Sequence, residues 1–199
     1  MSFNRIGAAA GLTLVAALLA SPFAGRAGEA TEQLRATIDG FVAIINSTPV
    51  SELVAHGLPE RARILVFARF DFSEMARRSL GSHWGTLNGG EQGEFVEGLS
   101  QRLLASYGRT VRSNNGDNIQ FKNEVREGEK VKVATQVVSG SGEEMPIDYR
   151  LHDVDGQWKV YDVVIDHVSL VNNYRAQFER VIAKSSVREL LRMMKNVNS

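Results

Sequence analysis

The residues of this chain that could carry out acid–base or metal chemistry are few and scattered. Asp148 and Asp162 fall in segments with the alternating pattern of strands, where a carboxylate could point into a cavity and act as a general acid or base. The alternation places Asp148 opposite Tyr149 and Asp162 opposite Tyr161, so we expect neither carboxylate to face the apolar interior. The histidines share no metal-ligand spacing and stand at His56, His83, His152 and His167.

No nucleophile motif, phosphate-binding loop or cysteine accompanies these residues. The sequence therefore predicts a protein that is not an enzyme and holds no metal. A cavity enzyme stays open as an alternative, because a single carboxylate aimed into a pocket would be enough for proton transfer. The lack of cysteine also means that the fold must depend on packing alone.

The first 27 residues have the features of a cleavable secretory signal, and residues 28–199 then form one domain. Arg5 supplies the positive start, residues 6–20 form an apolar run, and Gly25-Arg26-Ala27 offers small residues at a cleavage site. The apolar run is shorter than the roughly 20 residues that a bilayer span needs, although a retained anchor is the alternative. We therefore expect an exported protein.

The charge balance disfavours nucleic acid as a partner. The chain has 23 basic and 23 acidic residues, and removal of the signal would take away Arg5 and Arg26. The mature net charge of about −2 argues against affinity that comes from neutralised phosphates. It also argues against adhesion to an anionic bilayer through a basic patch.

Helical spacing of apolar residues predicts a helical first half and a helical tail. Asp71 with Glu74 and Asn88 with Glu91 form capping pairs at two helix starts. The long helix after Asn88 begins among four glycines, where stronger helix formers are expected. The expected helices cover residues 31–47, 59–68, 71–80, 88–112, 169–182 and 186–194.

Between residues 118 and 165 the apolar period changes to two, which predicts four strands joined by hairpins. The last strand is apolar on both sides, so both of its faces need cover. Its alternation assigns Trp158, Val160 and Val164 to one face and Tyr161, Val163 and Ile165 to the other. The fold class is α+β, with helices packed on a curved antiparallel sheet of about four strands. Ordinary core and an apolar cavity between sheet and helices are both compatible with this pattern.

Seven segments in order resemble the MlaC family of periplasmic phospholipid-binding proteins, also called toluene-tolerance auxiliary proteins. The similarity extends over about residues 31–195. The segments that carry it are Phe70–Gly81, His83-Trp84, Glu91-Gln92, Phe95-Val96, Ser106-Tyr107, Pro146–Leu151 and Trp158–Phe178.

The resemblance implies a cone-like fold, similar to the cystatin and nuclear-transport-factor families, with a deep apolar cavity. It implies a soluble periplasmic carrier that shuttles phospholipid between an outer-membrane lipoprotein–porin complex and an inner-membrane ABC transporter with an MCE-domain protein. Bound lipid would be cargo, with no cofactor, and we expect a monomer. A hopanoid-type lipid and a plain interaction module with an exposed groove are the alternatives, and the direction of transport stays open.

The lipid-binding residues are expected from the periodicity of each element together with the family architecture. Each of them could instead be ordinary core. Arg175, in the helix after the last strand, could pair with Asp162 or Asp166, and a contact to a phosphate is the alternative. The predicted lining residues are Leu99, Leu103, Tyr107, Val133, Val137, Tyr149, Leu151, Tyr161, Val163, Val171, Tyr174 and Phe178.

Overall fold

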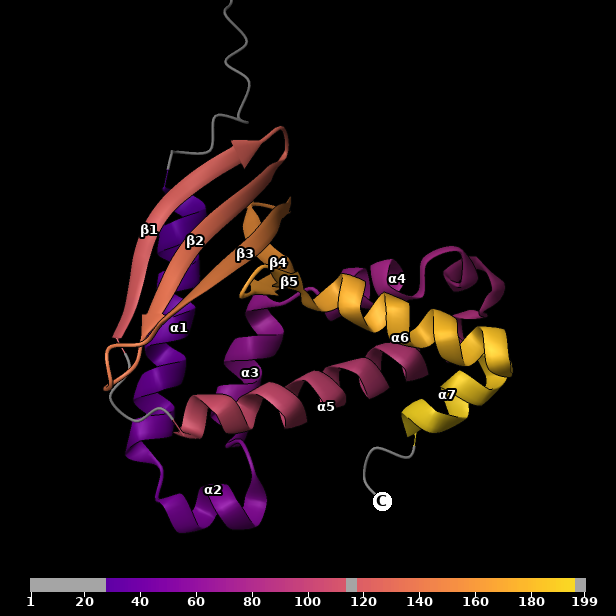
Figure 1. Ribbon diagram of the computed structural model, residues 1–199, viewed down its shortest axis with the longest axis horizontal. Helices are drawn as coiled ribbons and strands as arrows, with labels where there is room; N and C mark the ends of the chain where they lie inside the picture. The colour runs from indigo at the N-terminus through magenta and orange to yellow at the C-terminus, as the bar shows by residue number, and fades with distance from the viewer. Residues whose placement is uncertain (1–27, 114–117, 196–199) are drawn as a thin grey trace, which may run out of the picture.

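The order of the elements follows the periodicity of the sequence (Figure 1). The computed structural model describes residues 28–113 and 118–195, without the side chains of residues 107–113. The first half comprises α1 (Glu29–Ser47), α2 (Val50–His56), α3 (Glu60–Arg69), α4 (Phe72–Leu80), the 3₁₀ helix η1 (Gly81–Thr86) and α5 (Gly89–Ser113). The strands are β1 (Asn118–Glu127), β2 (Lys130–Val138), β3 (Glu144–Val154), β4 (Gln157–Ile165) and β5 (Val168–Ser169), followed by α6 (Leu170–Lys184) and α7 (Val187–Lys195).

The helices begin at the caps that the sequence predicts. The Asp71 carboxylate accepts a hydrogen bond of 2.8 Å from the Glu74 backbone N–H. Asn88 and Glu91 form the reciprocal pair of a capping box, with bonds of 2.9 and 3.0 Å. Helix α2 was not predicted, because its seven residues are too few to display a helical period.

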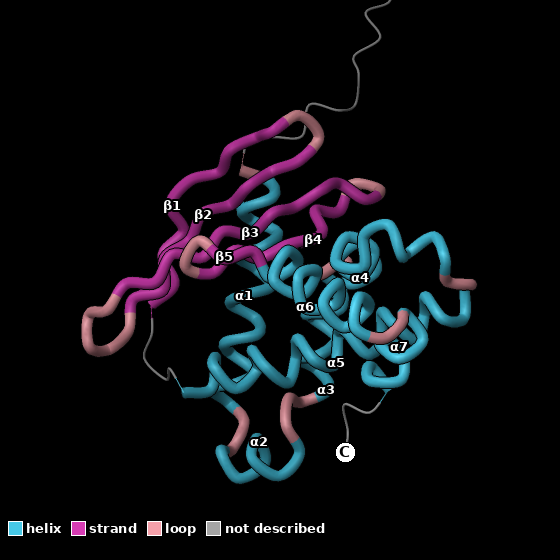
Figure 2. Tube along the Cα trace, turned by 45° about the vertical axis from the view of Figure 1, so that its right-hand side comes forward, coloured by secondary structure: helices cyan, strands magenta, loops and turns pink. Residues whose placement is uncertain are grey.

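The sheet is an antiparallel meander in the order β1-β2-β3-β4-β5. Its register aligns Val133, Tyr149 and Val163 on one face, which we call the inner face, and Lys132, Arg150 and Asp162 on the outer face. Helix α1 lies against the inner face (Figures 1 and 2), where the Arg35 guanidinium stacks 3.9 Å from the centroid of the Phe121 ring. The α+β fold class is therefore confirmed.

A bulge in β4 changes which residues share a face. Arg150 pairs with Asp162, but Leu151 pairs with Val160, so Tyr161 is an extra residue in the ladder. The bulge reverses the alternation and places Tyr161 beside Asp162 on the outer face. The prediction that Tyr161 shares a face with Val163 is wrong for this reason, as is the placement of Val164 with Val160.

The outer edge of β4 is paired along both of its halves. Phe70, between α3 and α4, forms a parallel bridge with Val160, and the Asp71 N–H donates to the Val160 carbonyl at 2.8 Å. The two-residue strand β5 pairs with the other half, Ser169 opposite Val164. These contacts fix the starts of α4 and α6 against the sheet.

Gly98 lies where α7 crosses α5 closely, and we expect Gly98→Ala to destabilise the protein. A Cβ atom there would lie 2.8 Å from the Met194 Cβ and 2.9 Å from the Met194 carbonyl oxygen. This overpacking should lower the free energy of unfolding by about 1–3 kcal/mol. Gly93 in the same helix has open space around it, so Gly93→Ala should raise the free energy of unfolding by about 0.4–1 kcal/mol. Urea unfolding checks both, and equal effects would contradict the close crossing.

Candidate functional site

The inner face of the sheet changes from a filled core to a partly open apolar surface along its length. Val131, Val133, Leu151 and Val160 are buried. Toward the β2–β3 hairpin the apolar side chains are only half-buried. We call this second region the apolar floor and define it by Phe121, Val137, Ile147, Tyr149 and Ile165.

Tyr149 is the residue of the apolar floor whose environment is most unusual. Burial raises the pKa of its hydroxyl to about 12. Its side chain nevertheless keeps part of its surface accessible. The Tyr149 ring therefore lies at the boundary between the filled core and the half-buried part of the inner face.

This raised pKa predicts a loss of stability at alkaline pH. The Tyr149 phenol has an ordinary pKa of 10.0 and a folded pKa of about 12. Because the folded value is higher, the stabilisation is complete below pH 10 and is lost as the pH rises to 12. The loss amounts to up to about 2–3 kcal/mol. Urea unfolding at pH 9 and pH 11.5 should show a smaller drop for Tyr149→Phe than for wild type, and identical drops would contradict the shift.

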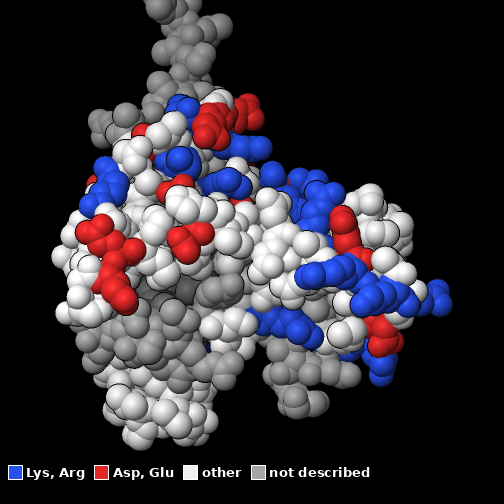
Figure 3. Space-filling view, viewed as in Figure 1, with Lys and Arg blue, Asp and Glu red and all other residues white. Residues whose placement is uncertain are grey.

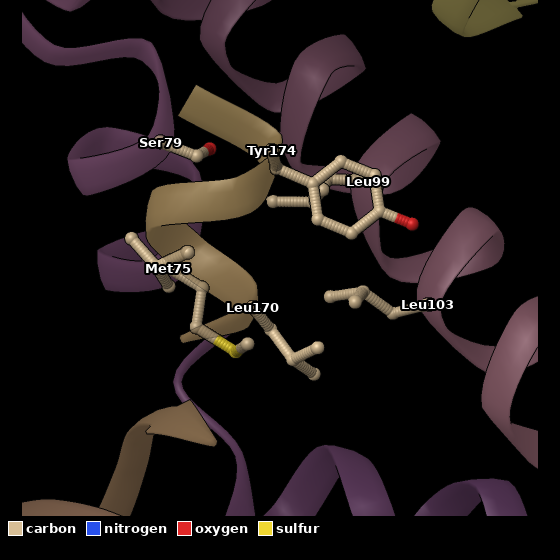
Figure 4. Close-up of a pocket in the computed structure, with 7 residues that line it drawn as sticks. Met75, Ser79, Leu99, Leu103, Leu170 and Tyr174 are labelled. Carbon is tan, nitrogen blue, oxygen red and sulfur yellow. The ribbon is translucent and has the colours of Figure 1, made fainter. Parts of the chain in front are cut away.

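Helices α4, α5 and α6 enclose an apolar crevice beside the sheet (Figure 4). Tyr174 of α6 points toward Leu99 and Leu103 of α5. The crevice is too narrow to admit a water molecule. It is therefore closed to an acyl chain in this conformation. Its lining residues are Met75, Ser79, Leu99, Leu103, Leu170, Val171 and Tyr174.

The predicted lining residues separate into two groups in space. Five share the inner face, namely Val133, Val137, Tyr149, Leu151 and Val163. Five lie among the helices: Leu99, Leu103, Val171 and Tyr174 line the crevice, and Phe178 stacks on Tyr174 and on Phe95. Tyr161 lies apart from both groups on the outer face. Tyr107 belongs to α5, but its side chain lies outside the described residues.

Three members of the apolar floor were missed by sequence reasoning, Phe121, Ile147 and Ile165. Ile147 has the same parity as Tyr149 and could have been found from that signal. Phe121 and Ile165 become neighbours of Tyr149 only through the pairing of four strands.

Asp162 is the most deeply buried carboxylate of the described region, at 3% exposure. It accepts hydrogen bonds from Arg150 at 2.9 Å, from the Ser169 hydroxyl at 2.7 Å and from the Val171 N–H at 3.2 Å. Arg175 instead pairs with Glu179 at 3.2 Å. The predicted partnership of Arg175 with Asp162 or Asp166 is therefore wrong, because Asp162 lies behind the start of α6 and Arg175 is on its exposed side.

Comparison with known proteins decides the family. A family model described as MlaC protein matches residues 36–196, which include all the strands and helices α2 to α7. The chain belongs to the MlaC family. The predicted family is thereby confirmed.

Two relatives of this MlaC-family chain support the assignment. The toluene tolerance protein ttg2D of Pseudomonas putida is 26% identical over 85 residues, which are 42% of this chain and 40% of that protein. The structure of a phospholipid-binding protein from Ralstonia solanacearum in complex with a phospholipid superposes with a TM-score of 0.74 at 21% identity. That match covers 84% of this chain and 95% of the other, and it shows that the two share a fold.

The polar residues of this MlaC-family chain are arranged as structural pairs. His152 lies 3.0 Å from the Asp71 carboxylate, and Asp148 lies 3.7 Å from Lys132. Within residues 28–113 and 118–195, no group of three or more acidic or histidine side chains could hold a metal ion. None of the described helices is long and apolar enough to cross a membrane. The predicted signal at residues 1–27 lies outside the described region.

Proposed function

We propose that this chain is a periplasmic lipid carrier that holds a phospholipid by its acyl chains and shuttles it between the outer and inner membranes. The observation that carries the proposal is the apolar floor, a set of apolar side chains that share the inner face of the sheet and are only half-buried. Membership of the MlaC family and the shared fold with a protein crystallised with a phospholipid support it. In this role the protein would help to maintain lipid asymmetry of the outer membrane.

A carrier is needed because exposing the acyl chains of a lipid to water is costly. Each methylene transferred out of water contributes about 0.8 kcal/mol of hydrophobic free energy. Two acyl chains with about 30 methylenes in total would therefore cost some 24 kcal/mol to expose to water. A free lipid cannot cross an aqueous compartment at a useful rate against that cost. A pocket that covers the chains removes most of this cost, because they stay in an apolar environment. The free energy of moving the lipid from a membrane into the carrier is then close to zero.

The proposed pocket lies between the apolar floor and the helices. Val137, Tyr149 and Ile147 would contact acyl chains, with Val133, Leu151 and Val163 as the buried residues beside them on the same face. Leu99, Leu103, Val171, Tyr174 and Phe178 would form the opposite wall once the narrow crevice opens. Since that crevice is too narrow for an acyl chain in this conformation, we expect cargo to widen it by moving α5 and α6 apart.

The proposed partners are those of a shuttle between two membranes. An outer-membrane lipoprotein–porin complex and an inner-membrane ABC transporter with an MCE-domain protein would exchange lipid with the carrier. The predicted signal at residues 1–27 places the mature chain in the compartment between them. We propose no catalytic step and no cofactor, with lipid as cargo alone.

Native mass spectrometry of the protein purified from its own periplasm tests the proposal. We expect one bound lipid per chain, and extraction should identify a phospholipid with two acyl chains. A hopanoid in the extract would support the carrier function and identify a different cargo. Protein recovered without lipid, and unable to take any up from vesicles, would contradict the carrier.

A further inference from the structure

A second cleft lies on the outer face of the sheet, away from the apolar floor. It has a volume of about 700 Å³ and separates the outer face of β2, β3 and β4 from the last turn of α4 and the starts of η1 and α6. Lysine and arginine side chains gather over the sheet and the helices on this side of the molecule (Figure 3). Six cationic side chains line the cleft against three acidic ones: Arg77, Arg78, Lys130, Lys132, Arg150 and Arg175 against Glu127, Asp148 and Asp162.

The acidic side chains of this outer cleft are largely neutralised by their own partners. Asp162 is paired with Arg150, and Asp148 lies 3.7 Å from Lys132. Glu74, outside the cleft, is shared between Arg77 at 2.6 Å and Arg78 at 2.7 Å, so one carboxylate serves two guanidinium groups. Lys130 makes no ion pair with any described residue. The cleft thus has more cationic than acidic side chains, with Glu127 opposite Lys130 in the strand register as the acid nearest to that lysine.

Tyr161 lies between the cations Arg78 and Lys130. The Arg78 guanidinium carbon is 4.4 Å from the centroid of its ring, and the Lys130 Nζ is 5.7 Å away. Burial raises the pKa of the Tyr161 hydroxyl, which therefore stays protonated and able to donate at neutral pH. The hydroxyl makes no hydrogen bond to any described residue. The β4 bulge thus brings a hydrogen-bond donor to a place flanked by two positive charges.

We propose that the outer cleft binds a phosphate group, held by Arg78, Lys130 and the Tyr161 hydroxyl. Two cations and one neutral donor match the charge and the several acceptor oxygens of a phosphate, and such charge-assisted bonds are stronger than neutral ones. The small net negative charge of the mature chain does not oppose this, since the cleft has its own local excess of cations. The sheet separates the site from the apolar floor, and Val171 lines both the outer cleft and the crevice between the helices. The phosphate contacts themselves use none of the residues proposed to touch acyl chains.

The test is a titration of the purified protein with inorganic phosphate at low ionic strength, followed by the backbone amide resonances of residues 78, 130 and 161. We expect saturable shifts for wild type. The double variant Arg78→Gln/Lys130→Gln should bind at least about tenfold more weakly, because it removes both charges. Tyr161→Phe, which removes only one donor, should weaken binding a few-fold and keep the fold intact.

Arg192→Gln is the matched control, because Arg192 is an exposed arginine of α7, paired with Glu189 outside the cleft. It should bind phosphate as wild type does. Flotation with phosphatidylglycerol vesicles identifies the source of the phosphate. Recruitment that the double variant loses points to a lipid headgroup, and saturation by phosphate without recruitment points to a soluble ligand. Equal behaviour of wild type and the double variant in both measurements would overturn the proposal.

Discussion

A Tyr149→Glu variant is expected to be purified without the lipid that we propose for the wild-type protein. The new carboxylate would lie on the apolar floor. A bound acyl chain would have to displace the water that hydrates this carboxylate. Burial of a carboxylate without a partner costs several kcal/mol, so the fraction of lipid-bound protein should fall at least about tenfold. Native mass spectrometry of both proteins, prepared in parallel, measures this fraction.

The fold of this variant should survive, because Tyr149 keeps part of its surface accessible and the carboxylate can stay hydrated in an empty pocket. Val154→Glu is the matched control, since Val154 is an exposed residue at the far end of the same strand. It should keep its lipid. Tyr149→Phe should also keep its lipid, because the ring and not the hydroxyl contacts the chains. Full lipid occupancy in Tyr149→Glu would contradict the proposed pocket.

Asp162→Ala is expected to cause a large loss of stability. The substitution removes the acceptor for the Ser169 hydroxyl and for the Val171 N–H at the start of α6, and leaves Arg150 without its partner. Unsatisfied donors, among them the buried Val171 N–H in the first turn of α6, should together lower the free energy of unfolding by about 2–4 kcal/mol. Arg150 is partly exposed and can be hydrated, which limits the electrostatic part of the loss. Urea unfolding at neutral pH measures the change.

Asp148→Ala is the comparison for this prediction. Asp148 lies one strand away on the same face and contacts Lys132 at 3.7 Å with both side chains about one-third exposed. A pair of this kind contributes less than about 1 kcal/mol. Similar losses in the two variants would show that the burial of Asp162 is not what stabilises the start of α6.

The helices and strands could be predicted because their signals are local. Asp71 with Glu74 and Asn88 with Glu91 mark helix starts by side chain and spacing alone. The bulge at Tyr161 could not be predicted, since an alternating strand and a bulged strand have the same sequence pattern in β4. The difference arises only where Leu151 and Arg150 pair with residues that are two apart, Val160 and Asp162.

The candidate site was predictable in part for a related reason. Val137 and Tyr149 could be assigned to one face because their strands have no bulge between the relevant residues. Leu99 and Tyr174 were recognisable as apolar helix positions, but periodicity does not reveal whether such a position lines a filled crevice or an open pocket. That depends on how far apart α5 and α6 lie, which is a property of tertiary packing.

The double pairing of β4 also bears on self-association. Phe70 pairs with one half of β4 and the strand β5 pairs with the other half. In the described sheet, β1 is therefore the only long edge strand with which a neighbouring molecule could pair. That strand is bent by a bulge at Lys122 and carries Glu124 and Arg126, features that discourage the addition of a foreign strand. A carrier of the proposed kind, which would expose apolar surface each time it exchanged cargo, would thereby be protected from edge-to-edge addition of strands into aggregates.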